Sequence, residues 1–256
     1  MKIRKQHFLI TALILSSISS WAQLANVESK VYKWRELIES PTTNGLKYKI
    51  FKGSTATLAE LEMNGWTLDP GQDFLFPINN KEHLIIVQRG ILDVVAYTLH
   101  RLNPGSIGLL NPGEDIFISN NSEEPVTFYL MSYTAKEPKV IVPDSLKRPF
   151  FVLWDNIEYK THDRGGIRNY FNTPTVMTEY FEMHVTNLNG LIKSHEPHTH
   201  EAAEIVLMIG GNTEMQIGEE FYQGTTGDVY YLGSDVPHAI RNLNDQQCQY
   251  FAFQWK

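Results

Sequence analysis

The sequence has the length and composition of a folded protein with an acidic balance. It contains 256 residues with a formal net charge of -7, and its residues are 12% aromatic and 20% charged. This balance argues against a nucleic-acid partner, since phosphate binding needs clustered Lys and Arg. No Lys/Arg-rich run follows residue 5, which also argues against a polybasic membrane-binding patch.

The first 22 residues have the three-part pattern of a secretory signal peptide. The basic start MKIRKQHF leads into the apolar stretch FLITALILSSISSW, and the small residues Ser20 and Ala22 precede Gln23. The apolar stretch is shorter than the ~20 residues that a membrane-spanning helix needs. We therefore expect residues 1–22 to be removed after Ala22, leaving a periplasmic or secreted protein that does not contact the membrane.

The rest of the chain is predicted to be all β. Short apolar or alternating runs recur, each about as long as one strand, and Gly, Pro, Asn and Asp stand between them. Examples are HLIIVQRG, GILDVVAY, EIVLMIGG, TEMQIG, GDVYYLG and QYFAFQW. Many short strands at close spacing predict a β-barrel or sandwich.

Two halves of the sequence repeat one another. GLKYKIFKGSTATLAELEM (45–63) parallels GGIRNYFNTPTVMTEYFEM (165–183) at an offset of 120, and later Gly105 matches Gly227 at an offset of 122. The nearly constant offset predicts two copies of one unit of ~110 residues. We place the first barrel at residues 23–134, a connection at 135–160 and the second barrel at 161–256.

Histidines and glutamates gather before an apolar run of the second copy, in HEPHTHEAAEIVLMIGG (195–211). His198 and His200 share one face of an extended segment, because side chains two apart point the same way. Glu204 follows, and His238 lies further on in SDVPHAIRN. Three imidazoles and one carboxylate suit a divalent metal such as Mn, Fe, Ni or Zn, with positions left open for water or substrate.

These segments resemble the two sequence motifs of the cupin family. GLIKSHEPHTHEAAEIVLMIGG has the Gly, His-x-His, Glu and Gly of the first motif, and GDVYYLGSDVPHAIRN has the Gly, His and Asn of the second. The spacer after the first Gly is two residues longer than the family's usual five, and Gly233 and Asp235 replace the usual Pro and Gly. The resemblance implies two tandem cupin barrels (double-stranded β-helices, or jelly rolls). It also implies a metal site in the second barrel, made by His198, His200, Glu204 and His238.

The first copy lacks this ligand set. Alignment places Pro77 and Asn79 where the His-x-His pair stands, His83 at the glutamate position and Ile116 at the last histidine. We therefore expect a degenerate first barrel that binds no metal, with His83 hydrogen-bonded in its interior. Such a barrel would cover the second one or form a homodimer.

Three further side chains are candidates near the metal motif. His195 would move protons near neutral pH from the barrel mouth, or serve only as a peripheral group. His184 would touch substrate if its strand face points inward. Arg241 would clamp a substrate carboxylate with its planar donor fork, or form a surface ion pair.

Four classes of function compete. A metal with open positions polarises a carbonyl or activates water, so our first expectation is an exported isomerase or lyase acting on a small oxygenated substrate, such as a sugar acid from polysaccharide breakdown. A second is a hydrolase similar to the bicupin ureidoglycine aminohydrolases, whose metal set includes a glutamine and a differently placed glutamate. A cupin dioxygenase and a non-catalytic ligand-binding bicupin are the other two.

Overall fold

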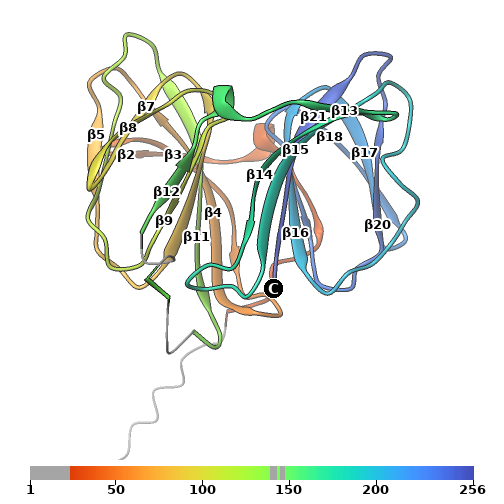
Figure 1. The fold of residues 1–256 in the computed structure, drawn as a ribbon, viewed down its shortest axis with the longest axis horizontal. Coiled ribbons are helices and arrows are strands. Elements are labelled where there is room, and N and C mark those ends of the chain that lie inside the picture. Colours follow the sequence, from red (N-terminus) through yellow and green to blue (C-terminus); the bar gives the residue numbers. More distant parts are fainter. Residues whose placement is uncertain (1–23, 139–142, 145–147) are drawn as a thin grey trace, which may run out of the picture.

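The protein consists of two β-barrels lying side by side (Figure 1). The computed structural model describes residues 24–138, 143–144 and 148–256, so the predicted signal peptide lies outside the described residues. Each barrel combines a seven-stranded sheet with a smaller sheet. Within the described ranges, no helix is long and apolar enough to cross a membrane. The prediction of an all-β protein with two tandem barrels is confirmed.

The N-terminal barrel has a large sheet of order β12-β9-β6-β11-β4-β3-β2 and a small sheet of order β5-β10-β7-β8. Its strands are β2 (Glu39–Thr42), β3 (Gly45–Gly53), β4 (Leu58–Leu68), β5 (Asp73–Phe76), β6 (Glu82–Arg89), β7 (Leu92–Ala96), β8 (Thr98–Leu102), β9 (Ile107–Leu110), β10 (Ile116–Ser119), β11 (Val126–Ala135) and β12 (Phe150–Val152).

The C-terminal barrel has a large sheet of order β1-β19-β16-β21-β15-β14-β13 and a small sheet of order β18-β17-β20. Its strands are β1 (Lys30–Tyr32), β13 (Lys160–His162), β14 (Gly165–Thr173), β15 (Phe181–Leu188), β16 (Ala203–Gly210), β17 (Asn212–Ile217), β18 (Glu220–Thr225), β19 (Val229–Leu232), β20 (His238–Asn242) and β21 (Cys248–Trp255).

The two large sheets pack against each other, and this explains the continuous apolar runs in the sequence. On β6, Ile85 belongs to the core inside the N-terminal barrel, while its neighbour Ile86 belongs to a core that both barrels share. On β16, Val206 belongs in the same way to the core inside the C-terminal barrel, and its neighbour Ile205 belongs to the shared core. Because side chains alternate along a strand, a strand covered on both faces is apolar at every position.

The two halves exchange their first strands. β1 pairs with β19 of the C-terminal barrel, and β12 pairs with β9 of the N-terminal barrel. A one-turn 3-10 helix follows each strand: η1 (Trp34–Glu36) and η3 (Trp154–Asn156). The structure thus places β1, from the predicted first barrel (23–134), in the sheet of the C-terminal barrel. It places β12, from the predicted connection (135–160), in the sheet of the N-terminal barrel. The repeat also begins earlier than the sequence comparison indicated, since the two tryptophans are 120 residues apart.

Tryptophan side chains fasten the exchanged segments. The backbone N–H of Trp34 donates to Asp228 Oδ1 at 2.8 Å, which ties the segment to the C-terminal barrel. Its ring also lies against Gly65 of the N-terminal barrel, where a Cβ atom would come within 2.5 Å of the ring. Trp154 is held in the opposite barrel by a hydrogen bond from its backbone N–H to Ser106 Oγ. Each exchanged segment therefore ties the two halves together.

Candidate metal centre

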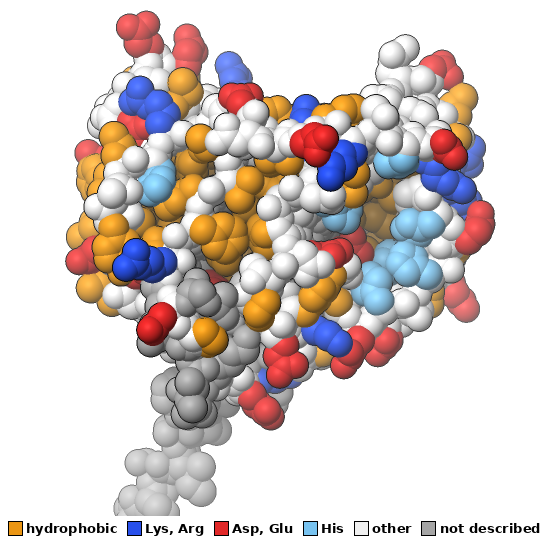
Figure 2. All heavy atoms as spheres, in the orientation of Figure 1, with side chains coloured by type: hydrophobic (Ala, Val, Ile, Leu, Met, Phe, Trp, Pro, Cys, Tyr) orange, Lys and Arg blue, Asp and Glu red, His pale blue; other side chains and the backbone are white. Residues whose placement is uncertain are grey.

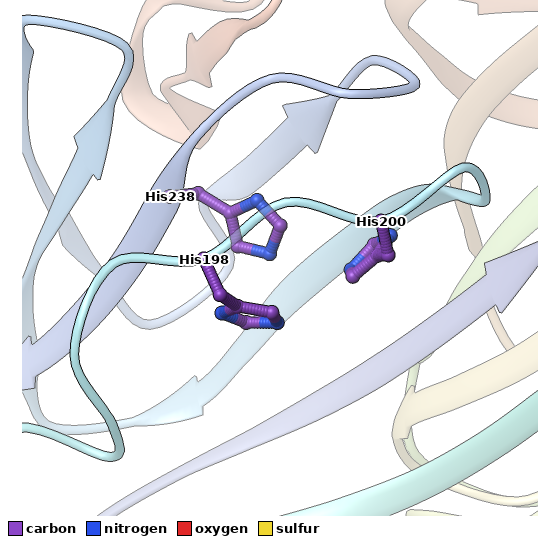
Figure 3. A group of neighbouring side chains, drawn as sticks. All are labelled: His198, His200 and His238. Atoms are coloured by element: carbon purple, nitrogen blue, oxygen red, sulfur yellow. The ribbon is translucent and has the colours of Figure 1, made fainter.

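Three histidines converge at one end of the C-terminal barrel, where the segment before β16 meets the start of β20. Figure 3 shows the rings of His198, His200 and His238 turned toward a common space, and one ring nitrogen from each lies within 4.8 Å of the other two. Reciprocal backbone hydrogen bonds join His198 and His238, with N–O distances of 3.0 and 3.2 Å. This bridge brings together residues that are 40 positions apart in the sequence.

The carboxylate of Glu204 lies against two of these rings. Its Oε2 is 3.2 Å from His200 Nε2 and 3.3 Å from His238 Nε2. Donor atoms that surround an ion at about 2.1 Å stand roughly 3 Å apart, so these spacings fit adjacent ligands. Burial raises the pKa of Glu204, but the polar contacts with His200 and His238 and the charges of these rings outweigh burial and lower it to about 2. Glu204 is therefore an anion at neutral pH.

Backbone carbonyls orient the rings. His200 Nδ1 lies 2.8 Å from Ala202 O, and His238 Nδ1 lies 2.8 Å from Val236 O. A carbonyl only accepts, so each Nδ1 carries a proton, and each Nε2, which faces Glu204, is the atom that would bind a metal in place of a proton. The buried Nε2 of His238 has no well-aligned hydrogen-bond partner among the described residues. Burial, followed by neighbouring imidazoles, lowers the pKa of His198, which favours the neutral ring that a metal needs. The donor set is compatible with a divalent metal ion.

The cluster lines a cavity of about 280 Å³. Figure 2 shows histidine side chains gathered around a hollow on this barrel. His184 lines the cavity from β15, and burial lowers its pKa, so it is neutral at pH 7. His195 is exposed at the rim, with its ring centroid 4.2 Å from that of His198. The structure therefore brings both candidate histidines, His184 and His195, to the cavity.

Arg241 does not line this cavity, so the predicted role in substrate binding is not supported here. His238 and Ile240 face the cavity from β20, and Arg241 is exposed on the alternate face of the strand. Arg164 lines the cavity instead. Its Nη1 donates to Lys193 O at 2.7 Å, and a guanidinium has further N–H donors available for a ligand. No local motif marks Arg164, which reaches the site from the turn between β13 and β14.

In the N-terminal barrel, His83 is a buried, hydrogen-bonded residue, as predicted. Its Nδ1 lies 2.8 Å from Ser132 Oγ and its Nε2 lies 3.1 Å from Asn79 Oδ1. Burial, followed by the charge of Lys81, lowers the pKa of His83 to about 4. This histidine is therefore neutral at pH 7.

The strand register corrects one position of the alignment. Phe76 lies opposite Ile116 in the β5–β10 pair, which is where His198 lies opposite His238 in the other barrel. The alignment had placed Pro77 there, one residue further on. Two apolar side chains thus replace a pair of imidazoles.

Comparisons with known proteins agree with this architecture. A family model described as "Cupin domain" matches residues 192–253. A glyoxylate-induced protein from Pseudomonas aeruginosa has a similar structure, with a TM-score of 0.69 at 16% identity over 86% of this chain and 84% of that chain. An oxalate decarboxylase from Lactobacillus farciminis, in complex with formate, gives a TM-score of 0.67 at 11% identity over 89% of this chain and 86% of that chain.

An oxalate decarboxylase from Bacillus subtilis, whose structure is described in terms of its Mn(II) centres, gives a TM-score of 0.69 at 12% identity over 89% of this chain and 77% of that chain. No curated protein matches the sequence. In the described part of the chain, two barrels with converging histidines in the second define a double-barrel protein with one candidate metal site. The chain has the fold of two tandem cupin barrels, and the cupin family model matches most of the second barrel.

Proposed function

We propose that this bicupin is a metal-dependent isomerase or lyase that acts on a small oxygenated carboxylate, such as a sugar acid. The observation that carries the proposal is the convergence of three imidazoles and one carboxylate in a cavity that also contains an arginine. At about 280 Å³ the cavity suits a small molecule rather than a polymer. The name oxalate decarboxylase, borne by similar structures, denotes cleavage of a small carboxylate and favours the lyase.

His198, His200, Glu204 and His238 would hold the ion. When bound there, a divalent metal would supply Lewis-acid polarisation of a substrate oxygen. Mn, Fe, Ni and Zn all suit this donor set, and Mn is the first to test because the Bacillus subtilis protein has Mn(II) centres. Arg164 would pair with the substrate carboxylate, since its planar donor fork matches a carboxylate.

Two histidines would handle the proton. The neutral imidazole of His184 would accept a proton from the carbon next to the substrate carbonyl, which is the step that isomerases and lyases of this kind share. His195, exposed at the rim, would exchange protons with solvent. An isomerase would return the proton to the adjacent carbon, whereas a lyase would release a leaving group.

The experiment measures turnover of uronic acids and other sugar acids by Mn-loaded protein, with product formation followed by NMR. His200→Ala should lose both bound metal and activity, whereas the matched variant His100→Ala, which lies in the other barrel, should keep both. Wild-type turnover rates from metal-free protein would refute the proposal. So would oxygen consumption by iron-loaded protein (dioxygenase), ammonia release from ureides (aminohydrolase), or a metal that affects only thermal stability (binding protein).

We also propose that the protein is exported and acts in the periplasm or outside the cell. The pattern of the first 22 residues supports this. The homodimer stays a prediction.

A further inference from the structure

The N-terminal barrel has a cavity of its own, of about 450 Å³. Glu62, Asn64 and Trp66 line it from β4, because alternate residues of a strand share one face. His83 and Ser132 line it from β6 and β11. The cavity thus lies where the metal-site cavity lies in the other barrel, with different side chains around it.

Asn64 and Trp66 each present a buried polar atom that has no hydrogen-bond partner among the residues that the structure describes. Asn64 is 3% exposed, and its Nδ2 donates to Glu62 Oε1 at 2.9 Å. A carboxylate accepts only, so this bond fixes the amide orientation and leaves Asn64 Oδ1 as the free acceptor. Trp66 Nε1 is a buried donor that also has no partner among the described residues. Buried polar atoms are normally paired, so each indicates a missing partner.

An acceptor and a donor on one strand face complement a hydroxyl group, which both donates and accepts. Phe74 stacks on Trp66 with ring centroids 5.1 Å apart, and Phe76 also lines the cavity. Aromatic side chains bury apolar surface beside a polar handle, which suits the C–H groups of a sugar ring. The chemistry of the lining therefore matches a compact ligand with several hydroxyl groups.

Each lysine and carboxylate of the lining has an oppositely charged partner. Lys47 Nζ lies 3.3 Å from Glu62 Oε1, and Lys81 Nζ lies 2.8 Å from Glu60 Oε1. His83 is neutral at pH 7, because burial lowers its pKa to about 4. A neutral ligand fits this lining better than an anion, in contrast to the cavity that contains Arg164.

We propose that the N-terminal barrel binds a neutral monosaccharide, with one sugar hydroxyl between Asn64 Oδ1 and Trp66 Nε1. The cavity volume lies within the roughly 300–1,000 Å³ that small-molecule sites occupy. The site uses no residue of the metal centre, so it stands whether or not the proposed reaction is correct.

The test titrates D-glucose, D-galactose and D-mannose into the full-length protein, using calorimetry and the NMR signal of the Trp66 indole N–H. Trp66→Phe keeps an aromatic ring but removes the donor, and Asn64→Leu keeps the approximate volume but removes the acceptor. Each should weaken binding at least tenfold. Trp154→Phe removes an indole N–H outside the cavity and should bind as wild type does, as should His200→Ala.

Failure of all three sugars to bind wild-type protein would overturn the proposal. So would unchanged affinity in both Trp66→Phe and Asn64→Leu, or binding that moves only signals near the metal centre. The indole signal of wild-type protein decides the matter even if a variant fails to fold, because hydrogen bonding by a sugar hydroxyl must shift it.

Discussion

His83 occupies in the N-terminal barrel the position that Glu204 occupies in the C-terminal barrel. His83 lies opposite Leu110 in the β6–β9 pair, and Glu204 lies opposite Leu232 in the β16–β19 pair. The same backbone position thus carries a neutral imidazole in one barrel and a carboxylate in the other. The fold provides the position, and the side chains decide whether it suits a cation.

Metal binding should stabilise the protein through the four converging side chains. Adding Mn²⁺ should raise the melting temperature of wild type, because a ligand that binds only the folded state at 100 times its Kd adds about 2.7 kcal/mol. Glu204→Ala should abolish the increase and His100→Ala should preserve it, as measured by scanning calorimetry with and without chelator. An equal increase in the Glu204 variant would remove that carboxylate from the ligand set.

Asn242→Ala should destabilise the C-terminal barrel. Asn242 Nδ2 donates to Leu188 O, Asn189 O and Gln246 O at 2.8 to 3.2 Å, and it is fully buried. Leaving a buried carbonyl unpaired costs about 1–3 kcal/mol, so the variant should unfold at a lower urea concentration. Asn169→Ala, at an exposed position, is the control. Equal midpoints for the two variants would contradict the assigned role.

Gly65→Ala should weaken the contact that holds the exchanged segment. A Cβ there would lie 2.5 Å from the Trp34 ring, so the ring must shift, at a cost of about 1–3 kcal/mol. Gly210→Ala is the matched control, because a Cβ at Gly210 meets nothing within 4 Å. Thermal unfolding of the two variants should differ clearly, and a Gly65 variant as stable as wild type would show that the ring moves freely.

Glu62 should make stability depend on pH. Burial raises its pKa, but hydrogen bonds from Asn64 and Lys52 and the charges of Lys47 and Lys52 outweigh burial and lower the pKa from 4.5 to about 2. A lowered folded-state pKa means that the stabilisation is complete above pH 4.5 and is lost as the pH falls toward 2.

Glu62→Gln should therefore be less stable than wild type at pH 7, by about 1–3 kcal/mol. The difference should shrink as the pH falls below 4.5. Urea unfolding at pH 7, 5 and 3.5 measures it. A difference that stays constant would mean that the carboxylate charge contributes nothing.

The exported form should begin at Gln23. N-terminal sequencing of protein recovered from the cell envelope or the medium should read Gln-Leu-Ala-Asn, because Ser20 and Ala22 provide the small residues before the cleavage site. Ala22→Arg should block cleavage, whereas Ala22→Ser should permit it. Retention of Met1 by all the wild-type protein would exclude a cleaved signal peptide.

The sequence by itself determined the two barrels and the residues of the candidate metal site. Strand-length apolar runs and a constant repeat offset are local or periodic signals, so they can be recognised in the sequence alone. The His-x-His spacing also fixes which face His198 and His200 share, because alternation along a strand is a property of the backbone. The motif resemblance then assigned His238, which lies 38 residues after His200, to the same site.

Only the tertiary structure decided which distant segments meet. It placed β1 and β12 in each other's barrels, Arg164 rather than Arg241 in the cavity, and Phe76 rather than Pro77 opposite Ile116. Such contacts depend on how two sheets pack and on which residues of two neighbouring strands pair. A shift of one residue in this pairing moves every side chain of the strand to the opposite face of the sheet. No local pattern encodes these choices, because the partner that settles each of them lies elsewhere in the chain.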